Sequence, residues 1–438
     1  MASATVLIDG NNFYASCEAV LDPSVAGRPL VVLSNNDGCV VSRSAEARAL
    51  GIPMGAPYFK VRQELEHQGV IVRSSNYSLY ADMSQRLMAT VEGWVEKLEV
   101  YSIDEAFGHL HRPRDQNGAR SEGSTRGGTD LTAWGQALRE EVRRHLGLPV
   151  AVGIAPTKVL AKVANRIAKH NAVYQGVFDL GAVADPDPWL EAIAIEDVWG
   201  IGRKLSRWAR LRGIADARAL RDMPSGELRR RCGVVGVRLQ QELQGHSCLP
   251  LVAVAPAKQE TCVSRSFSTP VGSLEELRQA IATYLSRAAE KLRRQRQRAG
   301  TITVFVRSSP FSGTQFYSNA ATTSLALPSN DTAVLLAAAL PLAKTLFRPH
   351  KPLQKAGVLM QDLQSVELLQ HHLLTPLTEA EQRRRAALMA TIDGLNQRYG
   401  RGTVQWAACG LRPTWAMRRS RLSRAATTRL SDIPVARA

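Results

Sequence analysis

Cysteines and uninterrupted apolar runs are both scarce in this chain. The six cysteines among 438 residues stand far apart. They lack the close pairs of a structural zinc site or a disulfide framework, so neither is expected and a reducing cytoplasm fits. The richest apolar stretch, 332–346, contains Pro341 and Lys344 and is shorter than the roughly 20 apolar residues of a membrane-spanning helix. The N-terminus shows no charged region followed by an apolar core, so no secretory signal is expected.

Acidic residues are also in short supply. The chain has 39 Asp and Glu against 56 Lys and Arg, which gives a net charge of +17. An excess of this size predicts a polyanionic partner, and nucleic acid is favoured over an anionic membrane surface. The length exceeds that of one compact domain, and a 45% share of hydrophobic residues allows each of several domains to bury a core.

The most informative acids are Asp104 and Glu105. The alternating residues 95–101 predict a strand before them, and residues 106–110 are apolar-rich again. Adjacent side chains of a straight strand point to opposite faces. Both carboxylates therefore serve one site only if the chain bends there, as at a hairpin tip. A lone Asp-Glu pair is more often an exposed acidic turn, so a second acidic strand end is needed.

That second acidic strand end lies near the N-terminus. Residues 5–8 form a short apolar run, which predicts a buried strand that ends at Asp9. With Asp104 and Glu105 it would supply three carboxylates, and carboxylate oxygens are ligands that Mg²⁺ prefers. Such a site can hold two Mg²⁺ roughly 3.5–4 Å apart, which clamp the attacking and leaving oxygens of a phosphoryl transfer.

Several motifs carry a family resemblance. IDGNNFYASCE (8–18) and YSIDEAF (101–107) resemble the Y-family of translesion DNA polymerases, and SNNDGCV (34–40) and SSNYSLYADMS (74–84) narrow the resemblance to the UmuC type. The likeness continues into GRGT (400–403). It implies an α+β multidomain fold shaped as a right hand, with a mixed-sheet palm, small fingers, a helical thumb with a helix-hairpin-helix, and a β-α-β-β-α-β little finger. The implied boundaries are palm 1–24 and 75–170, fingers 25–74, thumb 171–245, linker 246–258, little finger 259–361, and a basic C-terminal region 362–438.

The same resemblance implies error-prone, template-directed DNA synthesis in damage tolerance and SOS mutagenesis. The primer 3′-OH would attack the α-phosphate of an incoming dNTP, with two Mg²⁺ held by Asp9, Asp104, Glu105 and the carbonyl of Gly10. Two other classes of protein stay open. A two-metal nuclease needs no grip on a triphosphate, and a non-catalytic DNA-binding scaffold does not need all three acids.

Nucleotide-binding residues follow from the resemblance as well. Arg48 and Lys169 would bind the triphosphate, since an arginine fork suits phosphate oxygens. Phe13 and Tyr14 would lie at the nucleotide, and Tyr14 would be the steric gate that excludes a 2′-OH. The alternatives are solvated basic side chains and a core tyrosine. Ala45 is a departure, because many family members have a tyrosine at its position.

DNA contacts are expected from glycines and basic residues. The expected helix-hairpin-helix at 198–205 would bring backbone amides to a phosphate at a helix N-terminus. In the little finger, two arginines would track phosphates, and a lysine of the predicted helix 157–170 lies near the active site. The DNA-binding set is Lys158, Gly200, Gly202, Arg203, Arg265 and Arg307.

Two segments differ in composition from the rest of the chain. Residues 111–129 are polar and predict a flexible, inserted surface loop. Within 362–438, Gln370, Leu373 and Leu374 take the place of a clamp-binding motif in degenerate form, and the end of the chain has seven arginines and one acid, which predicts partial disorder. The partners implied by resemblance are primer–template DNA, dNTP, a UmuD′-like dimer, a RecA filament and a sliding clamp. The protein is expected in the cytoplasm at the nucleoid.

Overall fold

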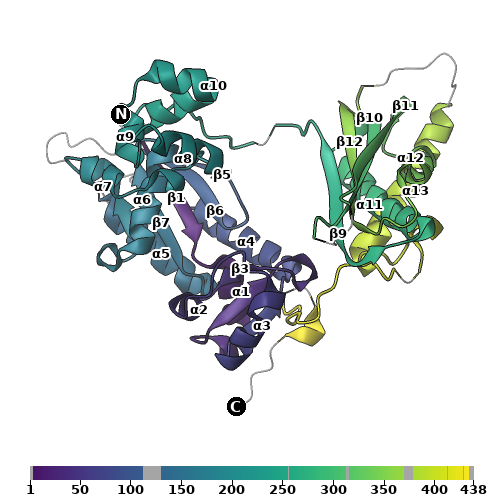
Figure 1. Cartoon of the computed structure of the whole chain (residues 1–438), viewed down its shortest axis with the longest axis horizontal. Helices are drawn as coiled ribbons and strands as arrows, with labels where there is room; N and C mark the ends of the chain where they lie inside the picture. Colours follow the sequence, from purple (N-terminus) through teal and green to yellow (C-terminus); the bar gives the residue numbers. More distant parts are fainter. Residues whose placement is uncertain are drawn as a thin grey trace. The chain divides into compact units, whose positions relative to one another are not determined.

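The structure of the chain is a computed structural model that describes residues 3–111, 130–254, 256–311, 315–368, 378–411, 413–427 and 429–433 (Figure 1). The chain forms two compact units. The first contains Met1–Ser34, Gly38–Ala255 and Arg421–Ala438, and the second contains Asn35–Asp37 and Pro256–Ser420. The end of the chain therefore belongs to the same unit as its beginning.

A five-stranded sheet forms the base of the first unit, with the strand order β5-β6-β1-β7-β8. The central strand β1 is antiparallel to both of its neighbours. This is the mixed sheet expected for a palm, and β8 extends it beyond residue 170. Its strands are β1 (Ser3–Gly10), β5 (Lys97–Val100), β6 (Glu105–His111), β7 (Val150–Ala155) and β8 (Val177–Asp179).

Helices cover both faces of this sheet. Successive side chains of β1 point to opposite faces, so its buried residues belong to two different cores. Val6 and Ile8 pack in one core with helices α1, α4 and α5, whereas Leu7 and Phe107 pack in another core with α6. Odd-numbered side chains of β1, Asp9 included, therefore face α6. These helices are α1 (Phe13–Leu21), α4 (Tyr77–Glu92), α5 (Leu131–Leu146) and α6 (Lys158–His170).

The ends of α5 show how its sequence defines a helix. Asp130 caps the N-terminus, since its carboxylate accepts a hydrogen bond from the Thr132 amide at 2.8 Å. Gly147 ends the helix with φ of +68°, a left-handed conformation that favours glycine. Between these ends, α5 buries Trp134 and Leu138 in the core that also contains Val6 and Ile8 of β1.

The fingers are a separate three-stranded sheet with the order β3-β2-β4. Strand β2 pairs in parallel with β4 and antiparallel with β3. Val31, Leu33 and Leu65 lie in its small core. The elements are β2 (Leu30–Leu33), β3 (Val40–Arg43), α2 (Ala45–Ala49), α3 (Tyr58–His67) and β4 (Ile71–Ser74).

Short helices follow the palm, as expected for a thumb. Leu190, Ile195 and Leu228 share a hydrophobic core with α6 of the palm, so this region is packed on the palm rather than linked loosely to it. The helices are α7 (Asp187–Glu191), α8 (Arg203–Arg210), α9 (Ala217–Asp222) and α10 (Ser225–Leu243). None of the helices in the described parts of the chain is long and apolar enough to cross a membrane.

The second unit contains the expected β-α-β-β-α-β succession. Its four-stranded antiparallel sheet has the order β11-β10-β12-β9, and its two long helices cover one face of that sheet (Figure 1). The elements are β9 (Thr261–Val271), α11 (Leu274–Arg294), β10 (Gln297–Ser308), β11 (Ser318–Ser329), α12 (Thr332–Leu346) and β12 (Leu353–Ser365).

The described part of the C-terminal region is folded. Helix α13 (Glu379–Tyr399) is fixed to α11 by a two-bond ion pair from Arg293 to Asp393, with N–O distances of 2.6 and 2.7 Å. Trp415 is buried between the rings of Phe267 and Tyr284. These contacts hold α13 and Trp415 in the second unit.

Candidate active site

Asp9 and Glu105 lie side by side in the palm. They are register partners of the antiparallel strands β1 and β6, so their side chains emerge on the same face of the sheet. That face is the one covered by α6, because Leu7 and Phe107, two residues away on each strand, pack against this helix. The two acidic strand ends expected from the sequence are therefore neighbours.

Asp104 joins them through a bend in the chain. Strand β5 ends at Val100 and β6 begins at Glu105. The Ser102 hydroxyl donates to the Asp104 carboxylate at 2.5 Å and accepts from the Glu105 amide at 3.1 Å. The Gly10 amide donates to the Asp104 carbonyl at 2.7 Å. These bonds hold the bend, so adjacent acids can serve one site.

Lysines of α6 neutralise two of these carboxylates. Lys169 Nζ lies 2.5 Å from Asp9 Oδ1, and Lys162 Nζ lies 2.5 Å from Glu105 Oε2. The two lysines are seven residues apart, so they lie on the same face of the helix. Lys162 was not among the site residues expected from the sequence.

An aromatic cage surrounds Lys162. Its ammonium lies 4.9 Å from the ring centre of Tyr101 and 5.7 Å from those of Phe107 and Trp199. Cation–π attraction of this kind is stronger where water is excluded. Trp199 begins the expected helix-hairpin-helix, and its indole N–H donates to the Tyr101 hydroxyl at 3.3 Å. The thumb therefore contacts the residue next to the acidic bend.

Lys158 has a different environment from the one expected for a DNA contact. It is buried, and its ammonium binds the Glu99 carboxylate at 2.5 Å and the Pro250 carbonyl at 2.9 Å. The same Glu99 oxygen, Oε2, also accepts a hydrogen bond from the Val252 amide at 2.7 Å. Lys158 thus fastens the segment after the thumb to β5, and it is not presented to a nucleic acid.

The neighbouring acids act on Asp9 electrostatically. Burial raises the pKa of Asp9 above its ordinary value, Lys169 opposes this, and the carboxylates of Glu105 and Asp104 raise it further. Across the parts of the chain that the structure describes, no group of three or more His, Cys, Asp or Glu side chains is arranged to hold a metal ion. Carboxylate oxygens are nevertheless the type of ligand that a hard divalent cation prefers.

Tyr14 lies beside these acids at the start of α1. Its ring stacks on Tyr80 with ring centres 4.3 Å apart and planes 14° apart, and it meets Tyr77 edge-on at 6.3 Å. Burial, followed by Tyr77 and Asp104, raises the pKa of Tyr14. Tyr80 was not singled out from the sequence as a site residue.

Phe13 has the complementary role. It is buried in the palm core, and its ring packs against Gly10, where an added Cβ would lie 3.0 Å from the ring. Phe13 therefore belongs to the core, whereas its neighbour Tyr14 is half-buried. Arg48, in α2 of the fingers, has an exposed side chain.

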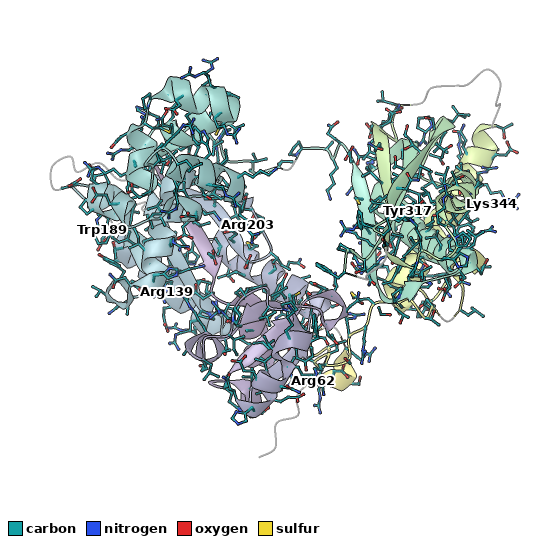
Figure 2. All side chains as sticks on the ribbon, in the orientation of Figure 1. Arg62, Arg139, Trp189, Arg203, Tyr317 and Lys344 are labelled. Carbon is teal, nitrogen blue, oxygen red and sulfur yellow. The ribbon has the colours of Figure 1, made fainter. Side chains whose placement is uncertain are left out.

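The expected helix-hairpin-helix has the backbone that its glycines require. Gly200 has φ of +91°, a conformation that L side chains rarely adopt. Gly202 caps α8 with an ordinary φ, and a Cβ there would meet nothing within 4 Å, so this glycine leaves the helix N-terminus open. Arg203, labelled in Figure 2, follows it with an exposed side chain.

The two arginines expected to track phosphates in the second unit lie on opposite faces of its sheet. Arg307 pairs with Lys355 and alternates with buried Val306, so it faces away from the helices. Arg265 pairs with Ala356 of the buried face. It is exposed at the edge strand, where its charge helps to lower the pKa of Lys291 in α11, chiefly lowered by burial.

Two expectations concern segments that the structure does not describe. The clamp-binding residues Gln370, Leu373 and Leu374 fall within 369–377, and the expected surface loop falls almost wholly within 112–129; both lie outside the described residues.

A solved structure with this fold is a DNA polymerase. The Y-family DNA polymerase chimera Dbh-Dpo4(243-245)-Dbh superposes with a TM-score of 0.63, covering 83% of this chain and 99% of its own, at 22% identity. The likeness at this identity concerns the fold. The chain therefore has the fold of a Y-family DNA polymerase.

Sequence comparison defines the family more closely. Residues 8–166 match the impB/mucB/samB family, and residues 258–373 match its C-terminal domain. Protein UmuC from Salmonella typhimurium is 43% identical over 98% of each chain. DNA polymerase IV 2 from Mesorhizobium japonicum is 29% identical, covering 93% of this chain and 95% of its own. The chain belongs to the impB/mucB/samB family. Residues 386–436 also match a domain of unknown function, DUF4113.

Proposed function

We propose that this chain is an error-prone translesion polymerase, which extends a primer on damaged template DNA by two-metal nucleotidyl transfer. The observation that carries the proposal is the register pairing of Asp9 with Glu105, with Asp104 held at the adjacent bend. A single exposed acidic turn would not produce this arrangement. Its basic surroundings on α6 suit a substrate that carries several phosphates.

Asp9, Asp104, Glu105 and the Gly10 carbonyl would hold Mg²⁺, which supplies charge neutralisation for phosphoryl transfer when bound. The protein's own contribution is positioning. Lys169 is paired with Asp9 in the structure. It would exchange this carboxylate for the triphosphate of an incoming dNTP once the acid is otherwise neutralised. Arg48 would bind the same triphosphate from the fingers with its exposed guanidinium.

Tyr14 would select the sugar. Its ring is backed by Tyr80 and cannot easily retreat, because Tyr80 is itself fully buried. A nucleotide sugar seated against the ring would accept a 2′-hydrogen and collide with a 2′-hydroxyl. Selection would thus depend on a steric clash with the wrong substrate, rather than on an added attraction to the right one.

DNA would be bound mainly through its backbone. Gly200, Gly202 and Arg203 would meet a phosphate at the open N-terminus of α8, while Arg265 and Arg307 would contact phosphates from different faces of the second unit. Such contacts position a duplex without reading its sequence. Lys158 is left out of this set because it is buried and paired.

Family membership supports further proposals about partners. The substrates would be primer–template DNA and dNTPs, and the protein would work with a UmuD′-like dimer, a RecA filament and a sliding clamp at the nucleoid during SOS mutagenesis. The segment containing Gln370, Leu373 and Leu374 would bind the clamp as an extended peptide.

A primer-extension assay on an abasic and an undamaged template tests the proposal. With dNTPs and Mg²⁺ we expect template-directed extension on both, and no extension after chelation of the metal. Shortening of the primer would instead identify a two-metal nuclease. Tight duplex binding without extension, in the presence of the partner subunits, would identify a scaffold. Arg48 and Lys169, which would bind a triphosphate, favour the polymerase over the nuclease and the scaffold.

A further inference from the structure

Near the end of the chain, residues 421–427 and 429–433 pack against other parts of the first unit, at the point where α4 begins. The Arg421 amide donates to the Ser74 hydroxyl at 2.9 Å, and the Ser74 amide donates to the Arg421 carbonyl at 2.9 Å. Leu422 continues this contact as a parallel bridge to Ser74. Ser74 is completely buried, so the segment is seated in the protein and does not lie loosely on its surface.

The segment is also closed on itself. Asp432 accepts a hydrogen bond from the Ala425 amide at 2.9 Å, and its own amide donates to the Arg429 carbonyl at 3.0 Å. Asp432 is the single acid among the arginines at the end of the chain. Its position gives these residues a defined conformation. We call the described residues of this segment, 421–427 and 429–433, the C-terminal strap.

Ser423 of the strap forms hydrogen bonds with two elements of the palm. Its hydroxyl accepts a hydrogen bond from Asn76 Nδ2 at 3.0 Å and donates to Glu18 Oε1 at 3.1 Å. Asn76 caps α4, because its side-chain oxygen Oδ1 accepts a hydrogen bond from the Leu79 amide at 3.3 Å. The strap therefore binds both the N-terminal cap of α4 and a buried carboxylate of α1.

Glu18 also forms a hydrogen bond with Tyr80. The same oxygen of Glu18 accepts a hydrogen bond from the Tyr80 hydroxyl at 2.6 Å. Glu18 is only 2% exposed, so the two hydroxyl donors compensate a carboxylate that is removed from water. Burial raises the pKa of Glu18, and the donors Tyr80 and Ser423 oppose that rise.

Tyr80 and Glu18 together define the position of Tyr14. Tyr14 and Glu18 are four residues apart in α1, so they lie on one face of that helix. Tyr80 touches both, with its hydroxyl on Glu18 and its ring stacked on Tyr14. A continuous series of contacts thus runs from Ser423 through Glu18 and Tyr80 to Tyr14.

We infer that the C-terminal strap sets the sugar selectivity of the nucleotide site, with Ser423 as a positioning residue that acts on Tyr14 through Glu18 and Tyr80. This rests on the proposed role of Tyr14 as the gate. It also assigns a role to part of the segment that matches DUF4113. Loss of the Ser423 donor frees the Glu18 carboxylate to move, and Tyr80 and the ring stacked on it move with it.

The test measures single-nucleotide insertion of dNTP and rNTP by the full-length chain. Ser423→Ala should raise the ratio of ribonucleotide to deoxyribonucleotide efficiency by about threefold to tenfold, a range that matches the net contribution of one ordinary hydrogen bond. Ser423→Thr keeps the hydroxyl and should keep the parental ratio. Ser431→Ala is the matched control, since the Ser431 hydroxyl is exposed and reaches only its neighbour Asp432.

Tyr80→Phe makes the test independent of the strap's own folding. It keeps the stacked ring and removes the bond to Glu18, so it should raise the same ratio, and adding Ser423→Ala to it should change the ratio little further. A purely structural role for Ser423 would lower both efficiencies equally and leave their ratio unchanged, which would overturn the inference. So would a Ser423→Ala ratio equal to that of Ser431→Ala.

Tyr14→Ala separates this inference from the proposed gate. If Tyr14→Ala raises the ratio while Ser423→Ala and Tyr80→Phe do not, the gate stands and the strap has no part in selectivity. If Tyr14→Ala leaves the ratio unchanged, Tyr14 is not the gate and the inference falls with it. Thermal unfolding of each variant shows that the compared proteins are folded.

Discussion

Asp9 and Glu105 are register partners across β1 and β6, and each is bound by its own lysine of α6. The site therefore balances two partly buried carboxylates with two ammonium groups. Removing one member of such a pair leaves the other charge uncompensated. A metal ion bound as proposed would compete with the lysines for the same oxygens.

Asp104→Asn should abolish primer extension while duplex binding is kept. The substitution removes one charge from the proposed metal site and keeps the size of the side chain. Changing a residue that only hydrogen-bonds to a metal ligand lowers metal affinity or activity by about 10–100-fold. Changing a direct ligand should therefore lower activity by more. Extension can be timed on a gel and duplex binding followed by anisotropy.

Asp82→Asn is the matched control for this prediction. It also removes one acid of the first unit, but Asp82 pairs with Arg86 on the surface of α4. Its activity should equal that of the parent. Extension by Asp104→Asn within tenfold of the parent would contradict the metal assignment.

Lys162→Met should make the protein depend on Mg²⁺ for stability. Without metal, Glu105 loses its partner in a largely buried setting, and we expect a loss of about 1–3 kcal/mol. Added Mg²⁺ should restore more of the melting temperature in this variant than in the parent, since the freed carboxylate binds the ion. Lys97→Met, which changes an exposed lysine of β5, should show neither effect. Equal responses of both variants to Mg²⁺ would contradict the competition between lysine and metal.

The acidic strand ends and the bend between them were predictable because they rest on local patterns. The apolar run before Asp9 and the alternation before Asp104 identify the strands. The pairing of Lys162 with Glu105 was not predictable, because it depends on which turn of α6 lies over the end of β6. Lys158 shares the same helix face and yet is buried on Glu99, a distinction that helix periodicity cannot make.

The strand faces and the strap were unpredictable for a related reason. Alternation shows that Arg307 is opposite to Val306, but only the register between strands shows that Arg265 lies on the other face. The strap has no apolar period, and hydrogen bonds to Ser74 and Asn76 hold it in place. Contacts between residues some 350 positions apart leave no trace in a local pattern.

DNA affinity should fall steeply with salt and depend little on template sequence. Each neutralised phosphate contributes a slope of about -0.9 in log K against log salt. Arg307 and Lys355 are register partners on the open face of the second unit, so replacing both with Ala should reduce the slope by about two. Arg62→Ala, which changes an exposed residue of α3 paired with Glu66, should leave it unchanged. Affinity titrations from low to high salt measure the slope, and an unaltered slope in the double variant would remove this face from the DNA-binding surface.

Tyr14→Ala should raise ribonucleotide incorporation far more than it lowers stability. The ring of Tyr14 is half-buried and stacked on Tyr80, whereas the neighbouring Phe13 is buried in the palm core. Adjacent residues of a helix point in different directions, so one ring can support the core while the other faces the site. Removing the Tyr14 ring opens the space that a 2′-hydroxyl needs, and it leaves the core intact.

Tyr14→Phe distinguishes the bulk of the ring from its hydroxyl. It preserves the stack on Tyr80, and a gate that acts by steric clash should still reject ribonucleotides at close to the parental ratio. Single-nucleotide insertion with matched dNTP and rNTP gives this ratio for both variants. If Tyr14→Phe loses selectivity as fully as Tyr14→Ala, the Tyr14 hydroxyl discriminates between the sugars by a polar contact and not by the volume of the ring.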